Sequence, residues 1–489
     1  MVLYYIGRIT VAVGLSLLLP FFTAIFFQEK APQIDYLFSL GIFLNLGFFL
    51  ILFFKIEKEL RWMHAMVIVS LTWLLMPILG AIPLYLSGHW RSFLDSVFDA
   101  MSGFATTGLT LVQDLDHLSM AHQMWRHQMM FIGGQGVIIM ALSFLGRGIG
   151  GILKIYVGEA REEKIFPNVI ETARFIWVVS IFYLILGSLI LGGIACLEGI
   201  SLKRAFFHGL WIFMAAFDTG GFAPHSQNIL YYHSFPFELA TIFMMFLGLI
   251  NFNLHYSLWI GKRKEFWRDI EIRTFFFTVI FTFLLVAIGL AKIRVYPEAV
   301  ALFRKGFYHL ISGHTGTGYM TVSPFEFVQA WPGLAMVGVI IAMGLGGAAC
   351  STTGGIKALR IGLVFKAFIQ DVKQLMLPDN TILVEKFHHI RDLILEDRHV
   401  RSAAIIFLAY LMLYVLGAIM GMLCGYPFLE SLFESTSAAA NVGLSCGITS
   451  PAMPTILKLT YIFQMWIGRL EFVAIFTLMG FLIALMRGK

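Results

Sequence analysis

The chain has 489 residues, of which 58% are hydrophobic and only 13% are charged, and its formal net charge is +6. Soluble domains carry about 25% charged residues, so this composition excludes an ordinary soluble domain and predicts a membrane protein. The sequence contains no HExxH motif and no nucleophile elbow, so we expect neither catalytic residues nor an organic cofactor.

Long apolar windows run along the whole chain. A helix needs about 20 mostly apolar residues to cross the hydrocarbon core, and the windows that qualify predict about ten spans. The first window contains Pro20 and no small-residue cleavage pattern follows it, so we expect a retained span rather than a signal peptide. The windows are 9–27, 36–54, 63–86, 128–146, 175–195, 236–260, 274–291, 332–350, 402–424 and 459–486.

Basic residues gather between these windows on one side of the predicted membrane. Of the 35 Lys and Arg residues, 23 lie in 55–61, 146–174, 262–273, 357–401 and 487–489. The positive-inside rule predicts that this side faces the cytoplasm. Because these basic runs sit in short loops next to the membrane, they do not indicate nucleic-acid binding.

The opposite side differs in charge. We expect it to be a surface without fixed cations, and we expect Asp114, Asp116 and Asp218 to concentrate cations at a mouth there. The segments of this side, which contain no Lys or Arg, are 110–123, 223–235, 320–331 and 446–457.

Four short stretches share one pattern. They align on Gly108, Gly221, Gly318 and Gly443, and a bulky apolar residue follows each glycine. An aromatic residue stands ten positions before the glycine, and a small residue stands six positions before it. These pairs are Phe98 and Ser102, Trp211 and Ala215, Tyr308 and Ser312, and Phe433 and Ser437.

The repeated order is an apolar span, a short segment, the glycine stretch and a second span. The short segment cannot cross a bilayer, so it predicts a half-helix followed by extended backbone. Irregular backbone at this depth must line a water-filled cavity or be buried in protein. Four such loops around one axis would place carbonyl oxygens in a ring, as in a potassium filter, and glycine reaches the φ > 0 that aims successive carbonyls one way.

The repeats predict an all-α integral membrane protein with four pseudo-repeats around one pore and two extra N-terminal spans. The predicted parts are 1–62 for the two extra spans, 63–160, 161–265 and 266–395 for repeats 1 to 3, and 396–489 for repeat 4.

The third repeat contains an unusual segment, 344–357, which reads GLGGAACSTTGGIK. Each glycine costs about 1 kcal/mol relative to alanine inside a helix, so its five glycines make a continuous helix improbable and predict a movable gate. Tight packing against a neighbouring span is the alternative. The aligned glycines of the second spans are Gly133, Gly248, Gly346 and Gly468.

Arg469 lies inside the last apolar window. Charges within a membrane usually face a cavity or a partner, and pairing with Glu471 or with a buried carbonyl is the alternative. The predicted gate residues are Gly346, Gly347, Ser351, Thr352, Thr353, Gly354, Gly355, Lys357 and Arg469.

The four repeats, the GGAACSTTGGIK segment at 346–357 and IGRLE at 467–471 resemble the Trk/Ktr/HKT superfamily of potassium transporters. The resemblance covers essentially the whole chain, and the two extra N-terminal spans are similar to the TrkH branch. It implies a K⁺ selectivity filter made of Thr106, Thr107, Gly108 and Leu109; Thr219, Gly220, Gly221 and Phe222; Gly316, Thr317, Gly318 and Tyr319; and Asn441, Val442, Gly443 and Leu444. The K⁺ ligands would be Thr107, Gly108, Gly220, Gly221, Thr317, Gly318, Val442 and Gly443.

The resemblance also implies partners and a location. It implies a homodimer in the cytoplasmic membrane of a prokaryote, with K⁺ as the permeant ion. A TrkA-type nucleotide-binding ring would contact cytoplasmic loops such as 146–174 and 357–401. Relatives with serine at the first filter glycine favour Na⁺, so glycine in all four repeats favours K⁺, whereas Asp218 beside the second filter is a departure that puts strict selectivity in doubt.

Three other functions compete with a K⁺ channel-like pore. The first is K⁺ symport coupled to H⁺ or Na⁺, and the second is a less selective pathway for Na⁺ and K⁺. The third is a membrane enzyme or receptor that transports nothing. Reversal potentials test the first, and flux through the purified chain in liposomes tests the others.

Overall fold

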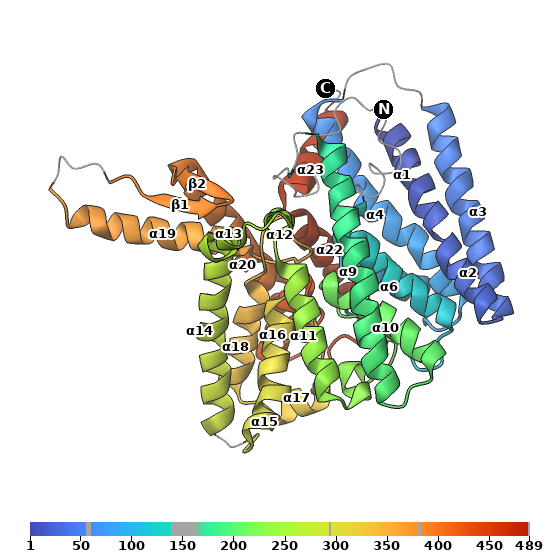
Figure 1. The fold of residues 1–489 in the computed structure, drawn as a ribbon. Coiled ribbons are helices and arrows are strands. Elements are labelled where there is room, and N and C mark those ends of the chain that lie inside the picture. Colours follow the sequence, from blue (N-terminus) through green and yellow to red (C-terminus); the bar gives the residue numbers. More distant parts are fainter. Residues whose placement is uncertain (55–59, 138–164, 166–167, 293–294, 379–382, 488–489) are drawn as a thin grey trace.

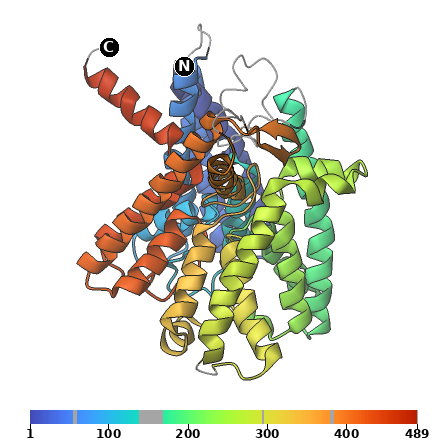
Figure 2. The same cartoon turned by 90° about the vertical axis from the view of Figure 1, so that its left-hand side faces the viewer.

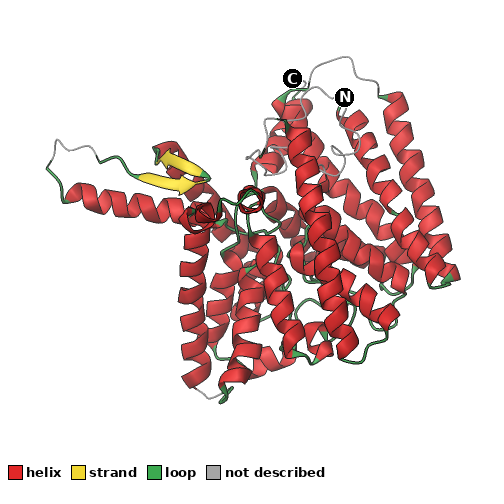
Figure 3. Ribbon diagram, viewed as in Figure 1, coloured by secondary structure: helices red, strands yellow, loops and turns green. Residues whose placement is uncertain are grey.

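The computed structural model describes residues 1–54, 60–137, 165, 168–292, 295–378 and 383–487. Figure 3 shows that helices dominate these residues, which confirms the predicted all-α membrane class. The one sheet in the described ranges is an unpredicted hairpin of β1 (Lys386–His389) and β2 (Arg391–Ile394). Most of the predicted cytoplasmic segments 55–61 and 146–174, and the end of the window 128–146, lie outside the described residues.

The N-terminal helices pack through small residues. α1 (Val2–Ser16) and α2 (Leu18–Phe26) are separated by Leu17 alone and lie beside α3 (Lys30–Phe53) on one flank of the molecule (Figure 1). A Cβ at Gly14 would lie 2.7 Å from Cβ of Phe43, and one at Gly47 would lie 2.6 Å from Val11. Glycine at these positions therefore lets two membrane helices approach closely.

Each repeat has a long first helix, a short second helix and a second span. Repeat 1 contains α4 (Trp62–Leu86), α5 (Phe93–Phe104) and α6 (Met120–Gln135), and repeat 2 contains α9 (Val169–Leu197), α10 (Leu202–Phe217), α11 (Phe235–Leu249) and α12 (Phe252–Trp259). Repeat 3 contains α14 (Ile270–Lys292), α16 (Tyr308–His314) and α18 (Gly333–Gly344), and repeat 4 contains α20 (Asp397–Leu423), α21 (Phe428–Ala439), α22 (Thr455–Leu470) and α23 (Val473–Met486). The connecting elements are η1 (Asn228–Tyr232), α13 (Arg263–Arg268), α15 (Ala299–Ala301), η2 (Leu302–Phe307), α17 (Pro324–Ala330) and α19 (Ala358–Leu375).

Six helical segments of the described chain are long and apolar enough to cross a membrane, and counting each bent pair as one span gives up to eight. The windows 236–260 and 459–486 are not straight spans, because α11 and α12 meet at 102° and α22 and α23 at 109°. In the window 332–350 the apolar helix, Gly333–Gly344, has only 12 residues.

A break interrupts the second span at the same place in every repeat. α6 ends at Gln135 with Gly136 at φ 100°, α11 ends at Leu249, α18 at Gly344 and α22 at Leu470. From the sequence, a break in the second span was predicted for the third repeat alone. Repeat 3 differs by placing a long irregular segment at this break, whereas repeats 2 and 4 turn sharply into another helix.

The two ends of the molecule differ in what they carry. Figures 1 and 2 place both termini and the β1–β2 hairpin at one end, and Figure 1 labels α15 and α17 at the other. Segments 262–273 and 357–401, two of the basic segments, belong to the end with the hairpin. These two basic segments thus lie away from α17, which falls within the segment 320–331 that lacks Lys and Arg.

Candidate ion-conduction pathway

The four short helices α5, α10, α16 and α21 end with the same backbone turn. Thr106, Thr219, Gly316 and Asn441 follow them with φ between 51° and 74°. The N–H of the next residue then bonds back, at 2.7–2.9 Å, to the carbonyl of the small residue of the repeat pattern. This is the Schellman arrangement that ends helices with a left-handed residue. The donor and acceptor pairs are Thr107 and Ser102, Gly220 and Ala215, Thr317 and Ser312, and Val442 and Ser437.

Three of these left-handed positions hold residues other than glycine. Left-handed backbone is uncommon for such residues, and for the β-branched Thr106 and Thr219 it stores strain that the surrounding structure must hold. The four turns therefore fix the direction of the backbone that follows each helix.

The aligned glycines close the four loops into a ring. All four have positive φ, between 72° and 95°. A Cβ on any of them would overlap a carbonyl oxygen of the next repeat, closer than real Cβ atoms approach. Because the order is repeat 1, 2, 3, 4 and back to 1, the loops surround one axis. The overlapping pairs are Gly108 with Gly220, Gly221 with Thr317, Gly318 with Val442, and Gly443 with Thr107.

The remaining predicted filter residues lie in and behind this ring. Leu109, Phe222, Tyr319 and Leu444 are all buried. The hydroxyl of Tyr319 donates to the carbonyl of Ile212 at 2.9 Å, which anchors the third loop to α10. The structure thus brings all four predicted quartets together.

Two buried carboxylates hold the segments that follow the ring in repeats 1 and 4. Asp99 accepts bonds from the Thr110 hydroxyl and the Leu111 N–H, both at 2.6 Å. Glu434 stands at the same distance before its glycine and accepts from the Ser445 hydroxyl and from three backbone N–H groups at 3.1–3.2 Å. Neither carboxylate was predicted from the sequence to have this role.

We expect Glu434→Leu to lower the melting temperature of the purified protein and to reduce Rb⁺ uptake. The change leaves the N–H groups of Cys446, Ile448 and Thr449 without their acceptor, and each buried unpaired donor costs about 1–3 kcal/mol. The melting temperature is measured by heating the protein and detecting the folded fraction by size-exclusion chromatography, and Rb⁺ uptake is measured in proteoliposomes. Glu430→Leu, one turn earlier on α21, is the control, and equal melting temperatures for the two variants would contradict the bracing role.

A cavity of about 400 Å³ opens on one side of the ring and is lined by Gly108, Gly221 and Gly443. Arg126 also lines it, with its guanidinium 4.1 Å from the Phe222 ring centre and Nε 3.9 Å from Asp99. The expectation of a mouth without fixed cations is therefore wrong, because this arginine lies just beyond the segment that lacks them.

Two of the three carboxylates predicted for the mouth lie in exposed pairs. Asp114 lies 2.9 Å from Nδ1 of His117, and Asp116 lies 3.0 Å from Nδ1 of His225. The hydrogen bond between Asp114 and His117 holds the pKa of the aspartate below its ordinary value and raises the pKa of the histidine.

Asp218 does not belong to this mouth, so its prediction there is wrong. It caps the carboxyl end of α10, on the other side of the ring, and is fully buried. Gln135 donates to it at 2.7 Å and in turn accepts from the Ser180 hydroxyl at 2.8 Å. The carboxylate thus contacts the end of α6.

The segment 345–357 lies beneath the ring and is irregular, as predicted. The Thr352 hydroxyl lies 2.9 Å from the carbonyls of Phe217 and Gly248 and 3.3 Å from the Thr219 hydroxyl. A Cβ at Gly316 would lie 3.8 Å from Thr353, whereas one at Gly354 would overlap the Ala440 carbonyl. The segment therefore contacts repeats 2, 3 and 4 directly.

Arg469 completes the contacts with repeat 1. It donates to the Thr352 carbonyl at 2.8 Å, to the Thr106 hydroxyl at 3.2 Å and to the Gly133 carbonyl at 2.5 Å. Its partners thus include buried carbonyls. This agrees with the alternative prediction for Arg469, in which its charge is paired rather than facing a cavity. Glu471 instead pairs with Arg360.

The remaining predicted gate residues contact other parts of the same segment. They are Gly346, Gly347, Ser351, Gly355 and Lys357. The Gly346 N–H donates to the Ile356 carbonyl at 2.8 Å. The Ser351 hydroxyl lies 2.9 Å from that of Thr353, and Lys357 donates to the Thr353 carbonyl. The structure therefore brings all the predicted gate residues to this place.

The aligned glycines of the second spans fit closely under the short helices. A Cβ at Gly133, Gly248 or Gly468 would overlap the carbonyl of Phe104, Phe217 or Ala439, respectively. Gly346 departs from the pattern, because it faces Gly354 within its own segment. In repeat 3 the second span, α18, has already ended at Gly344, which explains the difference.

This architecture defines a class of protein: a multi-pass helical membrane protein with four half-helices whose loops enclose one axis. The family model TrkH, described as "Cation transport protein", matches residues 38–483. The chain belongs to the TrkH family.

Relatives from different organisms match nearly the whole chain. It is 31% identical to an uncharacterized cation transporter of Methanocaldococcus jannaschii, over 98% of this chain and 94% of that protein. It is 30% identical to the Trk system potassium uptake protein TrkG of Escherichia coli, over 94% and 93%. The crystal structure of the potassium transporter TrkH from Vibrio parahaemolyticus has the same fold, with a TM-score of 0.81, 24% identity and 97% coverage of both chains.

Proposed function

We propose that this chain takes up K⁺ through a channel-like pore in the cytoplasmic membrane of a prokaryote. The observation that carries the proposal is the closed ring of Gly108, Gly221, Gly318 and Gly443 against the carbonyls of the neighbouring repeats. Carbonyl oxygens in such a ring replace the hydration shell of the permeating ion. The potassium uptake named for TrkG and TrkH of Escherichia coli supports the choice of ion.

Uptake of K⁺ by this route requires no ATP hydrolysis by this chain. A membrane potential of 100 mV contributes about 2.3 kcal/mol per monovalent charge, which suffices for large accumulation. The partial negative charge at the carboxyl ends of α5, α10, α16 and α21 faces the region beneath the ring and stabilises a cation there.

The segment 344–357 is the gate of this pore. It lies beneath the ring on the side away from the cavity and is fixed there by Thr352 and Arg469. A TrkA-type nucleotide-binding ring on the cytoplasmic side moves it, and the chain works as a homodimer. The basic segment 357–401 continues directly from the gate into α19, so a partner that binds α19 acts on the gate.

Cation flux in proteoliposomes tests the proposal. The purified chain is reconstituted, and uptake of K⁺, Rb⁺, Na⁺ and Li⁺ is compared. We expect K⁺ and Rb⁺ to pass and Na⁺ and Li⁺ to be largely excluded. Equal flux of all four ions would indicate an unselective cation pathway, and no flux at all would indicate an enzyme or a receptor.

One observation favours coupled K⁺ symport as the second candidate. The carboxyl group of Asp218 is buried beside the ring, and carboxyl groups within the membrane form the proton relays of many transporters. Under H⁺ coupling the reversal potential depends on the pH gradient, and Asp218→Asn abolishes that dependence. In an uncoupled pore the reversal potential follows the K⁺ gradient alone. Varying the Na⁺ gradient tests Na⁺ coupling in the same way.

A further inference from the structure

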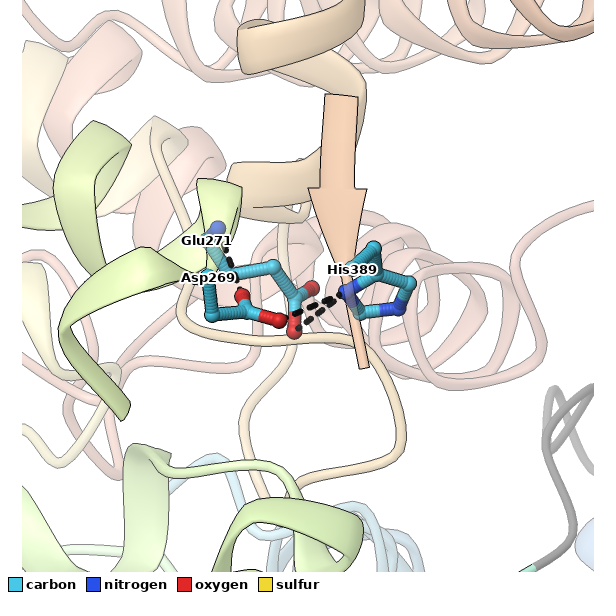
Figure 4. A group of neighbouring side chains, drawn as sticks. All are labelled: Asp269, Glu271 and His389. Atoms are coloured by element: carbon cyan, nitrogen blue, oxygen red, sulfur yellow. Dashed lines mark hydrogen bonds and ion pairs between the residues drawn. The ribbon is translucent and has the colours of Figure 1, made fainter. Parts of the chain in front are cut away.

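Figure 4 shows three neighbouring side chains, Asp269, Glu271 and His389, which form a buried cluster. Asp269 directly precedes α14, Glu271 is in the first turn of α14, and His389 is the last residue of β1. Their exposed fractions are 0%, 1% and 7%. The proposed pore uses none of the three residues.

The donor atoms of the cluster converge. Nδ1 of His389 lies 3.2 Å from Oδ2 of Asp269 and 3.9 Å from Oε2 of Glu271. All three donor atoms lie within 4.8 Å of one another. Zinc binds nitrogen and oxygen at about 2.0–2.2 Å in a tetrahedron, which sets donor atoms about 3.3 Å apart. Small side-chain rotations therefore bring this set to zinc geometry.

Backbone N–H groups bond to both carboxylates. The Glu271 N–H donates to Oδ1 of Asp269 at 2.8 Å, and the Ile390 N–H lies 3.2 Å from Oδ2. The Ala349 N–H donates to Oε1 of Glu271 at 2.6 Å. Oδ2 of Asp269 and Oε2 of Glu271 both face Nδ1 of His389. Oδ2 also accepts the Ile390 N–H, and Oε2 lies 3.5 Å from the side-chain nitrogen of Asn251.

The charges within the cluster do not cancel. Two carboxylates and one imidazole carry a net charge of −1 even when the imidazole is protonated, and −2 when it is neutral. A divalent cation bound at this point would interact favourably with both carboxylates, and a neutral imidazole is the form that ligates metals.

We propose that Asp269, Glu271 and His389 form a binding site for a zinc-class divalent transition metal. A mixed imidazole and carboxylate set favours such a metal over Mg²⁺ or Ca²⁺, which prefer oxygen ligands alone. Three protein ligands leave a fourth position for water.

This site joins the hairpin to the gate. His389 comes from the hairpin, and Glu271 holds the Ala349 N–H of the segment 344–357. Bound metal fixes Glu271 and so restrains the gate, which makes Zn²⁺ an inhibitor of cation flux. This regulatory step rests on the proposed function, whereas the metal site itself does not.

A cysteine scan with Co²⁺ tests the site in the purified full-length protein without measuring transport. His389→Cys places a thiolate in the site, so we expect Co²⁺ to produce a sulfur-to-metal charge-transfer band. His388→Cys is the matched control: its neighbouring imidazole pairs with Glu265 and Asp392 outside the cluster, and we expect no band. The same band in both variants, or in neither, would overturn the site.

Stoichiometry and flux complete the test. We expect wild type to bind one more Zn²⁺ per chain than Asp269→Asn and His389→Ala, and His388→Ala to bind as wild type does. Identical Zn²⁺ stoichiometry in all four proteins would also overturn the site. Zn²⁺ should slow Rb⁺ uptake by wild type but not by His389→Ala. If the site binds Zn²⁺ and uptake is unchanged, the link to the gate is refuted.

Discussion

Gly318→Ser is expected to reduce the preference for K⁺ over Na⁺ by at least about tenfold, which corresponds to about 1.4 kcal/mol of lost discrimination. Gly318 has φ 83°, and its Cβ would overlap the Val442 carbonyl oxygen. Serine must therefore displace that carbonyl or leave the left-handed conformation, and both changes misplace a cation ligand. Permeability ratios from reversal potentials under K⁺ and Na⁺ gradients measure the effect.

Two further variants make this prediction specific. Gly108→Ser should act in the same direction, because its Cβ would overlap the Gly220 carbonyl in the same ring. Gly193→Ser is the control, since this glycine lies on an exposed face of α9 with no atom within 4 Å of a built Cβ. Unchanged ratios in both ring variants would refute the filter assignment.

Deletion of residues 347–353 is expected to raise Rb⁺ uptake several-fold and to weaken control by a cytoplasmic partner. It removes Thr352 and Thr353, which contact repeats 2 and 3 beneath the ring. The gap is easy to close, because Gly346 already touches Gly354 and the Gly346 N–H bonds to the Ile356 carbonyl at 2.8 Å. α18 and α19 can therefore keep their positions.

A milder variant separates gating from damage to the fold. Thr352→Val keeps the shape of the side chain but removes its hydroxyl, so we expect a smaller rise in uptake. Thr460→Val is the control, because its hydroxyl bonds only to the Ile456 carbonyl of its own helix, on an exposed face. A monodisperse deletion variant with uptake at or below wild type would count against the gate.

The sequence predicted the shared geometry of the four glycine loops because that geometry depends on local rules. The glycine at the third position of each quartet and the small residue six positions earlier both have direct backbone roles. Thr106 and Thr219 show where composition fails, since no propensity predicts a left-handed conformation for threonine, whereas asparagine, as at Asn441, is enriched in it. Only the shared alignment places these three residues in the same turn as Gly316.

Some features of the structure were not predicted from the sequence. Asp99 and Glu434 occupy one position of the repeat, and the alignment would have revealed them had acidic residues been compared across it. Asp218 is adjacent to the predicted filter in sequence, yet it lies on the opposite side of the ring from the cavity. The reason is that α10 runs from the cavity side toward the ring, and Asp218 caps its carboxyl end. The breaks at Ile250 and Glu471 interrupt windows that are apolar on average, and hydropathy carries no signal of helix direction.

The ring has a consequence for biogenesis. The last loop meets the first, and the Asn441 side chain donates to the Thr107 hydroxyl across 334 residues of sequence. A chain emerging from the ribosome has inserted three repeats before the fourth can close this contact. An incomplete chain therefore has an open-sided ring, and the ring closes only when synthesis is nearly finished.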